Sequence, residues 1–129
     1  MAQDDKQVLA AAAAGDAAAL QAALAAGGDP KARDRLGAPA LALAAARGAG
    51  DCVALLLEAG AEVGKTSDAG NSALMMAAAR GELDCVRQLL AAGADPGHRN
   101  KWGMSARDWA HWPANSDEIQ AVLFAAAED

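Results

Sequence analysis

The sequence predicts an all-α solenoid in which helix–turn–helix units stack side by side. The first observation is a motif that returns every 33 residues, as in Gly37, Gly70 and Gly103 or in Cys52 and Cys85. The second is the composition, which is 53% hydrophobic, dominated by alanine and only 3% aromatic. Alanine is the strongest helix former and lets helices approach closely. A fixed period of this length is typical of chains in which each unit covers its neighbour's apolar face.

The first two units each predict a pair of short helices separated by a glycine. In the first unit Gly15 separates a helix containing Val8 from one containing Leu20. In the second unit the first helix begins at Pro39, which is tolerated at a helix start but offers no hydroxyl cap. Gly48 ends that helix, because a left-handed residue is usually needed at such a position.

The third unit carries the pattern most completely. Ser72 is a good N-cap for a short apolar helix that ends at Gly81. Asp84 then places negative charge at the start of the second helix, where the helix dipole favours it. The apolar stripe of that second helix has the spacing i, i+3, i+6, i+7 and consists of Leu83, Val86, Leu89 and Leu90.

The fourth unit keeps the register but departs from the pattern. Gly103 and Ile119 hold their expected positions, whereas Arg107 stands where an apolar residue belongs. Terminal units are expected to be atypical because one side faces water. The four units are predicted at about 4–33, 34–66, 67–99 and 100–129, within one domain that spans residues 1–129.

The repeated unit resembles the ankyrin repeat. Its Gly-x-Thr-Pro-Leu-His-x-Ala-Ala…Gly…Val…Leu-Leu…Gly-Ala-Asp pattern is followed in order by Gly70-Asn-Ser-Ala-Leu74, Ala77-Ala78, Gly81, Val86, Leu89-Leu90 and Gly93-Ala-Asp95. No unit has the full Thr-Pro-Leu-His tetrapeptide. The resemblance covers almost the whole chain, with the outer units acting as caps. It implies a protein that binds a partner through its turn tips and the exposed flank of each first helix, which together form a concave face.

Carrying those positions over by register gives a set of predicted partner-binding residues. The tip and flank positions hold six of the 11 Lys and Arg residues against one acid, while other acids begin the second helices or follow them. We therefore expect a basic concave face on a chain of net charge −6. For any single Arg, solvation of the surface is the simpler interpretation. The predicted binding residues are Arg33, Arg35, Leu36, Arg47, Asp68, Asn71, Arg80, Arg99, Lys101, Trp102, Met104 and Trp112.

Tryptophan and methionine add apolar candidates to this face. Trp102 falls at a turn tip and Trp112 on a first-helix flank, and exposed Trp beside Arg is typical of an interface hot spot. The alternative is that both rings shield the core of the last unit. Trp109 is expected to be at least partly packed inside. Met75 and Met76 are expected to divide between the core and the groove floor.

The sequence offers little for chemistry. Cys52 and Cys85 occupy one position in adjacent units, which predicts a separation of about 8–10 Å, beyond the roughly 4.4–6.8 Å that a disulfide spans. We therefore expect free, buried thiols. His98 and His111 have no partners at metal-ligand spacing. Asp108 and His111 are three residues apart, which predicts a surface hydrogen bond. No enzyme activity, cofactor or metal is predicted.

The leading hypothesis is a non-catalytic module that docks an acidic or mixed patch of another protein on its concave face. An inhibitor or immunity protein is a more specific form of this hypothesis, and the alanine-rich composition favours a bacterial source. The alternative is binding of a polyanion or nucleic acid through the Arg row, which a pI of about 4.7 disfavours. A designed scaffold is a third interpretation, which the irregular tetrapeptides oppose.

The expected location is the cytoplasm, with no membrane association. No apolar run approaches the ~20 residues of a membrane helix, and the first residues lack the basic region of a secretory signal. We expect a monomer when the protein is free of its partner.

Overall fold

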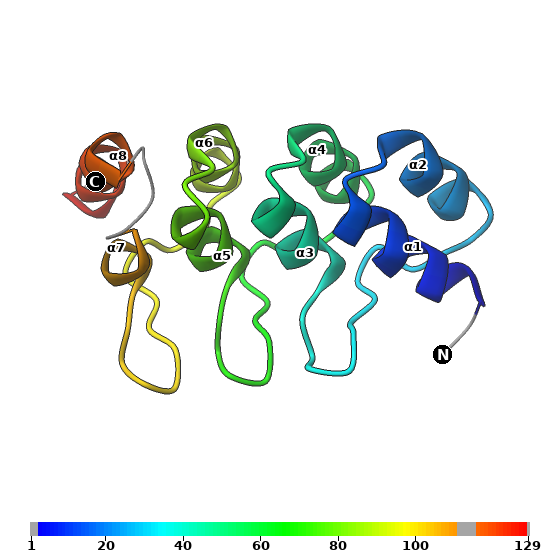
Figure 1. Ribbon diagram of the computed structural model, residues 1–129, viewed down its shortest axis with the longest axis horizontal. Coiled ribbons are helices and arrows are strands. Elements are labelled where there is room, and N and C mark those ends of the chain that lie inside the picture. Colours follow the sequence, from blue (N-terminus) through cyan, green and yellow to red (C-terminus); the bar gives the residue numbers. More distant parts are fainter. Residues whose placement is uncertain (1–2, 111–115, 129) are drawn as a thin grey trace.

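The computed structural model describes residues 3–110 and 116–128, which form eight helices in four antiparallel pairs (Figure 1). The first helices of the pairs form one row and the second helices form a parallel row (Figure 1). Long turns project beyond the first row on the side away from the second helices (Figure 1). The helices are α1 (Gln3–Ala14), α2 (Ala17–Ala25), α3 (Ala40–Arg47), α4 (Gly50–Glu58), α5 (Ala73–Ala79), α6 (Leu83–Ala91), α7 (Ala106–Trp109) and α8 (Ser116–Glu128).

The core repeats with the period of the sequence. Leu20, Val53, Val86 and Ile119 follow one another at intervals of 33 residues, and each is 0% exposed. They lie in the second helices, which face a row of small buried alanines in the first helices. Helix α3 packs between α1 and α5, and α5 packs between α3 and α7. The predicted stacking of one unit on the next is therefore confirmed.

The helix ends also agree with the sequence. The Ser72 hydroxyl accepts a hydrogen bond from the backbone N–H of Met75 at 3.2 Å, whereas Pro39 provides no side-chain cap. Gly48 and Gly81, which follow α3 and α5, have φ angles of 76° and 73°. An alanine in this left-handed region would be strained. The glycines are therefore what lets the chain reverse direction so soon after each first helix.

Three residues at equivalent positions stabilise the projecting turns. The Asp34 carboxylate accepts hydrogen bonds from the backbone N–H groups of Leu36 and Ala38. The Ser67 hydroxyl accepts one from the backbone N–H of Asn71, and the side-chain oxygen of Asn100 accepts two from backbone N–H groups of its own turn. A short polar side chain that satisfies local backbone donors is a common way to fix a turn. Each turn is therefore stabilised by hydrogen bonds from one of its own side chains, independently of its contacts with neighbouring turns.

Neighbouring turns are then joined through their backbones. The N–H of Asp68 donates to the carbonyl of Leu36 at 3.0 Å, and the N–H of Lys101 donates to the carbonyl of Ala69 at 3.0 Å. Gly70 lies where two turns approach, since a Cβ atom there would meet the backbone of Asn100 at 3.1 Å. The turns consequently form a continuous ribbon rather than independent loops.

None of the helices within residues 3–110 and 116–128 is long and apolar enough to span a membrane.

Candidate functional site

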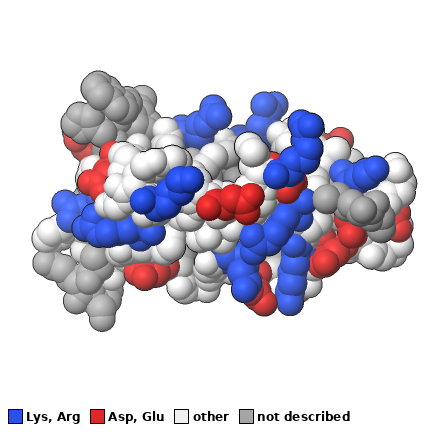
Figure 2. All heavy atoms as spheres, turned by 90° about the horizontal axis from the view of Figure 1, so that it is seen from below, with Lys and Arg blue, Asp and Glu red and all other residues white. Residues whose placement is uncertain are grey.

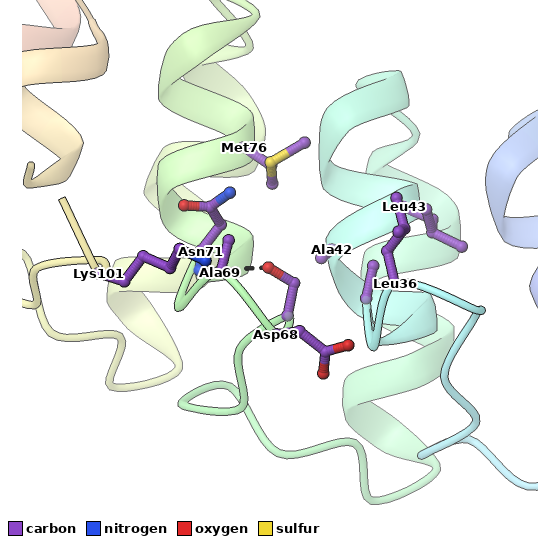
Figure 3. A pocket seen from close by; sticks show the side chains of 10 residues that line it. Leu36, Ala42, Leu43, Asp68, Ala69, Asn71, Met76 and Lys101 are labelled. Carbon is purple, nitrogen blue, oxygen red and sulfur yellow. Dashed lines mark hydrogen bonds between the residues drawn. The ribbon is translucent and has the colours of Figure 1, made fainter.

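An apolar groove lies between the turns of the second and third units, which precede helices α3 and α5, and is lined in part by these helices (Figure 3). Its volume is about 330 Å³. Leu36 and Leu43 lie on one side of it, Met76 and Asn71 on the other, and Ala42 between them (Figure 3). Its lining residues are Leu36, Ala38, Ala42, Leu43, Ser67, Asp68, Ala69, Asn71, Met76 and Lys101. Four of the predicted partner-binding residues, namely Leu36, Asp68, Asn71 and Lys101, are therefore brought together.

The groove exists because the second unit carries small side chains on its wall. Ala38 and Ala42 line the groove, and the residues 33 positions later are the larger Asn71 and Met75. Met75 is fully buried in the core while Met76 lines the groove, as predicted for this pair. The small side chains thus open space at the junction of the second and third units, although the backbone repeats along the chain.

A second, shallower hollow adjoins this groove. It has a volume of about 450 Å³, and Leu43 contributes to both surfaces. Arg47, the last residue of α3, and Arg80, the C-cap of α5, line it together with Glu82. Glu82 was expected, together with Asp84, to place negative charge at the start of the second helix of its unit. It is the N-cap of α6 and lines this hollow, where its carboxylate lies against Gly48 at the end of α3.

The face that bears the turns is accordingly mixed in charge rather than uniformly basic. Figure 2 shows Lys and Arg side chains over much of this face, with Asp and Glu side chains between them, including near its centre. The exposed Asp68 also belongs to this surface. Separation of the acids by register is therefore only partial, because Glu82 at a helix start lines the hollow and Asp68 at a turn tip lines the groove.

The turn tips present exposed apolar side chains. Leu36 is 74% exposed and Trp102 is 62% exposed, and these two residues occupy the same position in the second and fourth units. Met104 is 37% exposed and accepts a hydrogen bond at its sulfur from the indole N–H of Trp109 at 3.2 Å. The ammonium group of Lys101 lies 5.2 Å from the Trp102 ring centroid. Large exposed apolar side chains of this kind are typical of interaction surfaces.

The three tryptophans separate into different roles. Trp102 lies at an exposed tip and does not cover the core of the last unit. Trp109 is half-buried and packs against the core, as predicted. Trp112 lies outside the described residues.

The structure does not bring Arg33 and Arg99 into the groove. The Arg33 guanidinium donates to the carbonyls of Gly37 and Thr66 at 3.1 and 2.8 Å, and that of Arg99 donates to Gly103 at 2.6 Å. Their surroundings contain neither Leu36 nor Leu43 but belong to two other surface hollows. Prediction by register placed them at the turns correctly but could not tell that they brace the turns. Arg35 is exposed at the tip beside Leu36.

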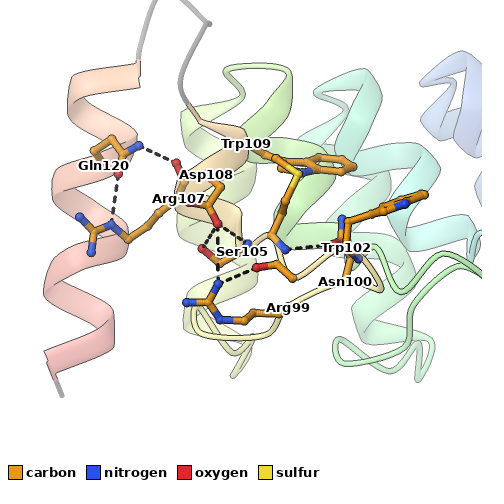
Figure 4. A network of polar contacts seen from close by, with 10 residues as sticks. Arg99, Asn100, Trp102, Ser105, Arg107, Asp108, Trp109 and Gln120 are labelled. Carbon is orange, nitrogen blue, oxygen red and sulfur yellow. Dashed lines mark hydrogen bonds and ion pairs between the residues drawn. The ribbon is translucent and has the colours of Figure 1, made fainter.

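A polar network stabilises the last unit (Figure 4). The Asp108 carboxylate accepts hydrogen bonds from the backbone N–H and the hydroxyl of Ser105, at 2.8 and 3.3 Å, in a capping box. The Ser105 N–H is the main cause of the lowered pKa of Asp108, and the nearby Arg99 contributes at 4.0 Å. The predicted contact of Asp108 with His111 involves a residue outside the described ranges. The Ser-x-x-Asp spacing was the sequence signal for this network.

Helix α8 is tied to α7 by a reciprocal pair of contacts. The Arg107 side chain donates to Gln120 at 3.2 Å, and the Gln120 amide donates to the Arg107 carbonyl at 2.6 Å. Arg107 also lies over the ring of Phe124, 5.1 Å from its centroid. The charged residue that interrupts the repeat pattern therefore contributes to closing the terminal unit.

Both cysteines are free thiols buried in the second helices, as predicted. Burial raises the pKa of the Cys85 thiol to about 11, with Glu82 and Asp84 adding to the effect. Burial also raises the pKa of Cys52. Raised pKa values suppress the thiolate form that nucleophilic chemistry requires.

Stacked helix pairs, projecting turns and an open groove define a helical repeat protein of the binding type. A sequence model of ankyrin repeats in three copies matches residues 8–100. The chain belongs to the ankyrin repeat family, whose members generally mediate protein–protein interactions and are typically non-catalytic. The pair formed by α7 and α8 lies beyond the matched range. A search of curated proteins found no match.

Proposed function

We propose that residues 1–129 act as one non-catalytic binding domain whose protein partner docks on the turn tips and the first-helix flanks. The observation that carries this proposal is the pair of exposed tips, Leu36 and Trp102, on the same side as the apolar groove. A Trp or a large aliphatic residue surrounded by polar groups is a typical interface anchor. The turns are already joined by backbone hydrogen bonds, so docking needs little ordering of the chain.

The test is affinity capture from a lysate of the source organism, followed by mass spectrometry. The wild type is compared with Trp102→Ala/Arg80→Glu, which changes the face at two exposed positions. The matched control is Phe124→Ala, because Phe124 is 47% exposed but lies on α8, in the row of second helices. The proposal expects a protein that the wild type and the control capture and the double variant does not. Equal capture by all three would place the site elsewhere.

A more specific form of the proposal is a bacterial inhibitor or immunity protein. A preorganised ribbon of turns can cover a partner's active site without rearranging, which favours tight binding. The measurement is the activity of the captured partner with and without an equimolar amount of this chain. Inhibition that the wild type produces and Trp102→Ala/Arg80→Glu does not would support this role. Full activity in the complex would instead indicate a scaffold.

The alternative is binding of a polyanion through the Arg residues. Two observations weigh against it: Arg33 and Arg99 are committed to backbone carbonyls, and Glu82 and Asp68 contribute negative charge to the face. Binding of a single-stranded oligonucleotide should therefore be undetectable at physiological salt. Strong binding that weakens steeply as salt rises would favour the alternative instead.

A further inference from the structure

We infer that the apolar groove takes one large aliphatic or aromatic side chain from an acidic segment of the partner. This inference rests on the proposed function, and it specifies the chemistry of the segment that docks. The groove volume of about 330 Å³ is near the lower end of the range of roughly 300–1,000 Å³ for ligand pockets. Such a volume suits one large apolar side chain better than a broad protein surface.

The lining of the groove is largely apolar. Leu36, Leu43 and Met76 converge on it, and Ala42 forms its floor between them (Figure 3). Met76 is unbranched and polarisable, so it adapts to side chains of different shape. Leu36 is largely exposed, so a side chain inserted beside it would remove apolar surface from water on both molecules.

The groove and the adjoining hollow carry more positive than negative side chains. Lys101 lines the groove itself, while Arg47 and Arg80 line the hollow that shares Leu43 with it. The same two surfaces hold two carboxylates, those of Asp68 and Glu82, which leaves a local excess of one positive charge on a chain of net charge −6. Arg prefers carboxylate partners because its planar donors bind them in pairs. A segment anchored in the groove and continuing over the hollow is therefore best matched by carboxylates.

The test is a selection of short random peptides displayed on phage against the immobilised full chain. Enriched peptides should combine a large apolar residue with at least one Asp or Glu on one side of it. A synthetic enriched peptide, fluorescently labelled, is then titrated with the wild type and with variants. Leu36→Asp should weaken binding at least about tenfold, since it places a charge at the groove wall. The control Phe124→Ala should leave binding unchanged.

A second variant tests the charge argument separately. Arg47→Glu/Arg80→Glu should weaken peptide binding roughly tenfold, and raising the salt from about 0.05 to about 0.5 M should weaken the wild type more than this variant. Both positions are exposed, so the helical circular dichroism signal should be retained.

The outcomes separate the two proposals. Enriched peptides that lack acidic residues, or a peptide affinity that Arg47→Glu/Arg80→Glu leaves unchanged, would overturn the inference. If Leu36→Asp still abolished peptide binding in that case, the proposal that partners dock on the concave face would be retained. Peptides insensitive to every change on this face would count against both proposals. Enrichment of no peptide would overturn the inference alone, because lysate capture tests the proposed function independently.

Discussion

Replacing Asn100 tests whether the turns are held by their own side chains. Asn100 is buried, and its side-chain oxygen Oδ1 accepts hydrogen bonds from the backbone N–H groups of Trp102 and Met104 at 2.9 and 3.1 Å. Its amide donates to the Asn71 side chain at 3.0 Å. Asn100→Ala removes all three hydrogen bonds, which fix the turn of the fourth unit internally and link it to the turn of the third unit. The turn that presents Trp102 should loosen as a result.

The expected cost follows from these contacts. Three hydrogen bonds at about 0.5–1.5 kcal/mol each give roughly 1.5–4.5 kcal/mol. Water can reach the two released N–H groups in part, because Trp102 and Met104 are themselves exposed. We therefore expect the free energy of unfolding to fall by about 2–3 kcal/mol for Asn100→Ala. The measurement is urea denaturation followed by circular dichroism, with the slope of the transition checked for each variant.

Two controls make the comparison decisive. Asn71→Ala removes only the side-chain link between turns, and should cost about 1 kcal/mol. Asn100→Asp keeps both accepted backbone bonds and should also lose less stability than Asn100→Ala. If Asn100→Ala is no more destabilising than Asn71→Ala, the oxygen that caps the turn contributes nothing measurable, and the account of the turns is wrong.

Three further predictions concern the core, a glycine and the thiols. Leu56→Ala should lower the free energy of unfolding by about 2–5 kcal/mol because Leu56 is fully buried. Leu36→Ala should change it by less than about 0.5 kcal/mol because Leu36 is exposed. Equal effects of the two variants in urea titrations would contradict this difference in burial. Gly70→Ala should destabilise the protein more than Gly60→Ala in the same assay, because only Gly70 has backbone within 4 Å of an added Cβ atom. Cys85 should resist a thiol reagent at about pH 8 until urea unfolds the chain. Burial raises the pKa of this thiol from about 9 in the unfolded chain to about 11 in the folded protein. The contribution of the protonated thiol to the free energy of unfolding is therefore complete below about pH 9 and is lost as the pH rises toward 11. Rapid labelling of the native protein, or an unfolding midpoint that stays constant over this range, would contradict the buried thiol.

The repeat period made most of the fold predictable. Positions 33 residues apart share one environment, so the buried Val53, Val86 and Ile119 could be assigned together. Helix ends were marked by residues with strong local preferences, such as Ser72 and Gly81. The fold of such a chain can be predicted from its sequence because the local signals and the long-range packing favour the same structure.

The candidate site was only partly predictable, because register gives a residue's position but not the direction of its side chain. Arg33 and Arg99 were correctly placed at turns, yet their guanidinium groups donate hydrogen bonds to backbone carbonyls of the turns. Glu82 begins a second helix as expected, but it lines the hollow beside Arg80. The groove itself depends on a small side chain at Ala42, where the next unit has a large one, and a repeat consensus conceals such a difference.

Docking on the concave face is tested most directly by hydrogen exchange of the chain alone and in complex with the protein captured from the lysate. Binding should slow the exchange of backbone amides at the turn tips, at residues 35–38, 68–71 and 101–104, and should leave exchange in the second helices α2, α4 and α6 unchanged. Slower exchange confined to those second helices, with the turn tips unaffected, would contradict docking on the concave face.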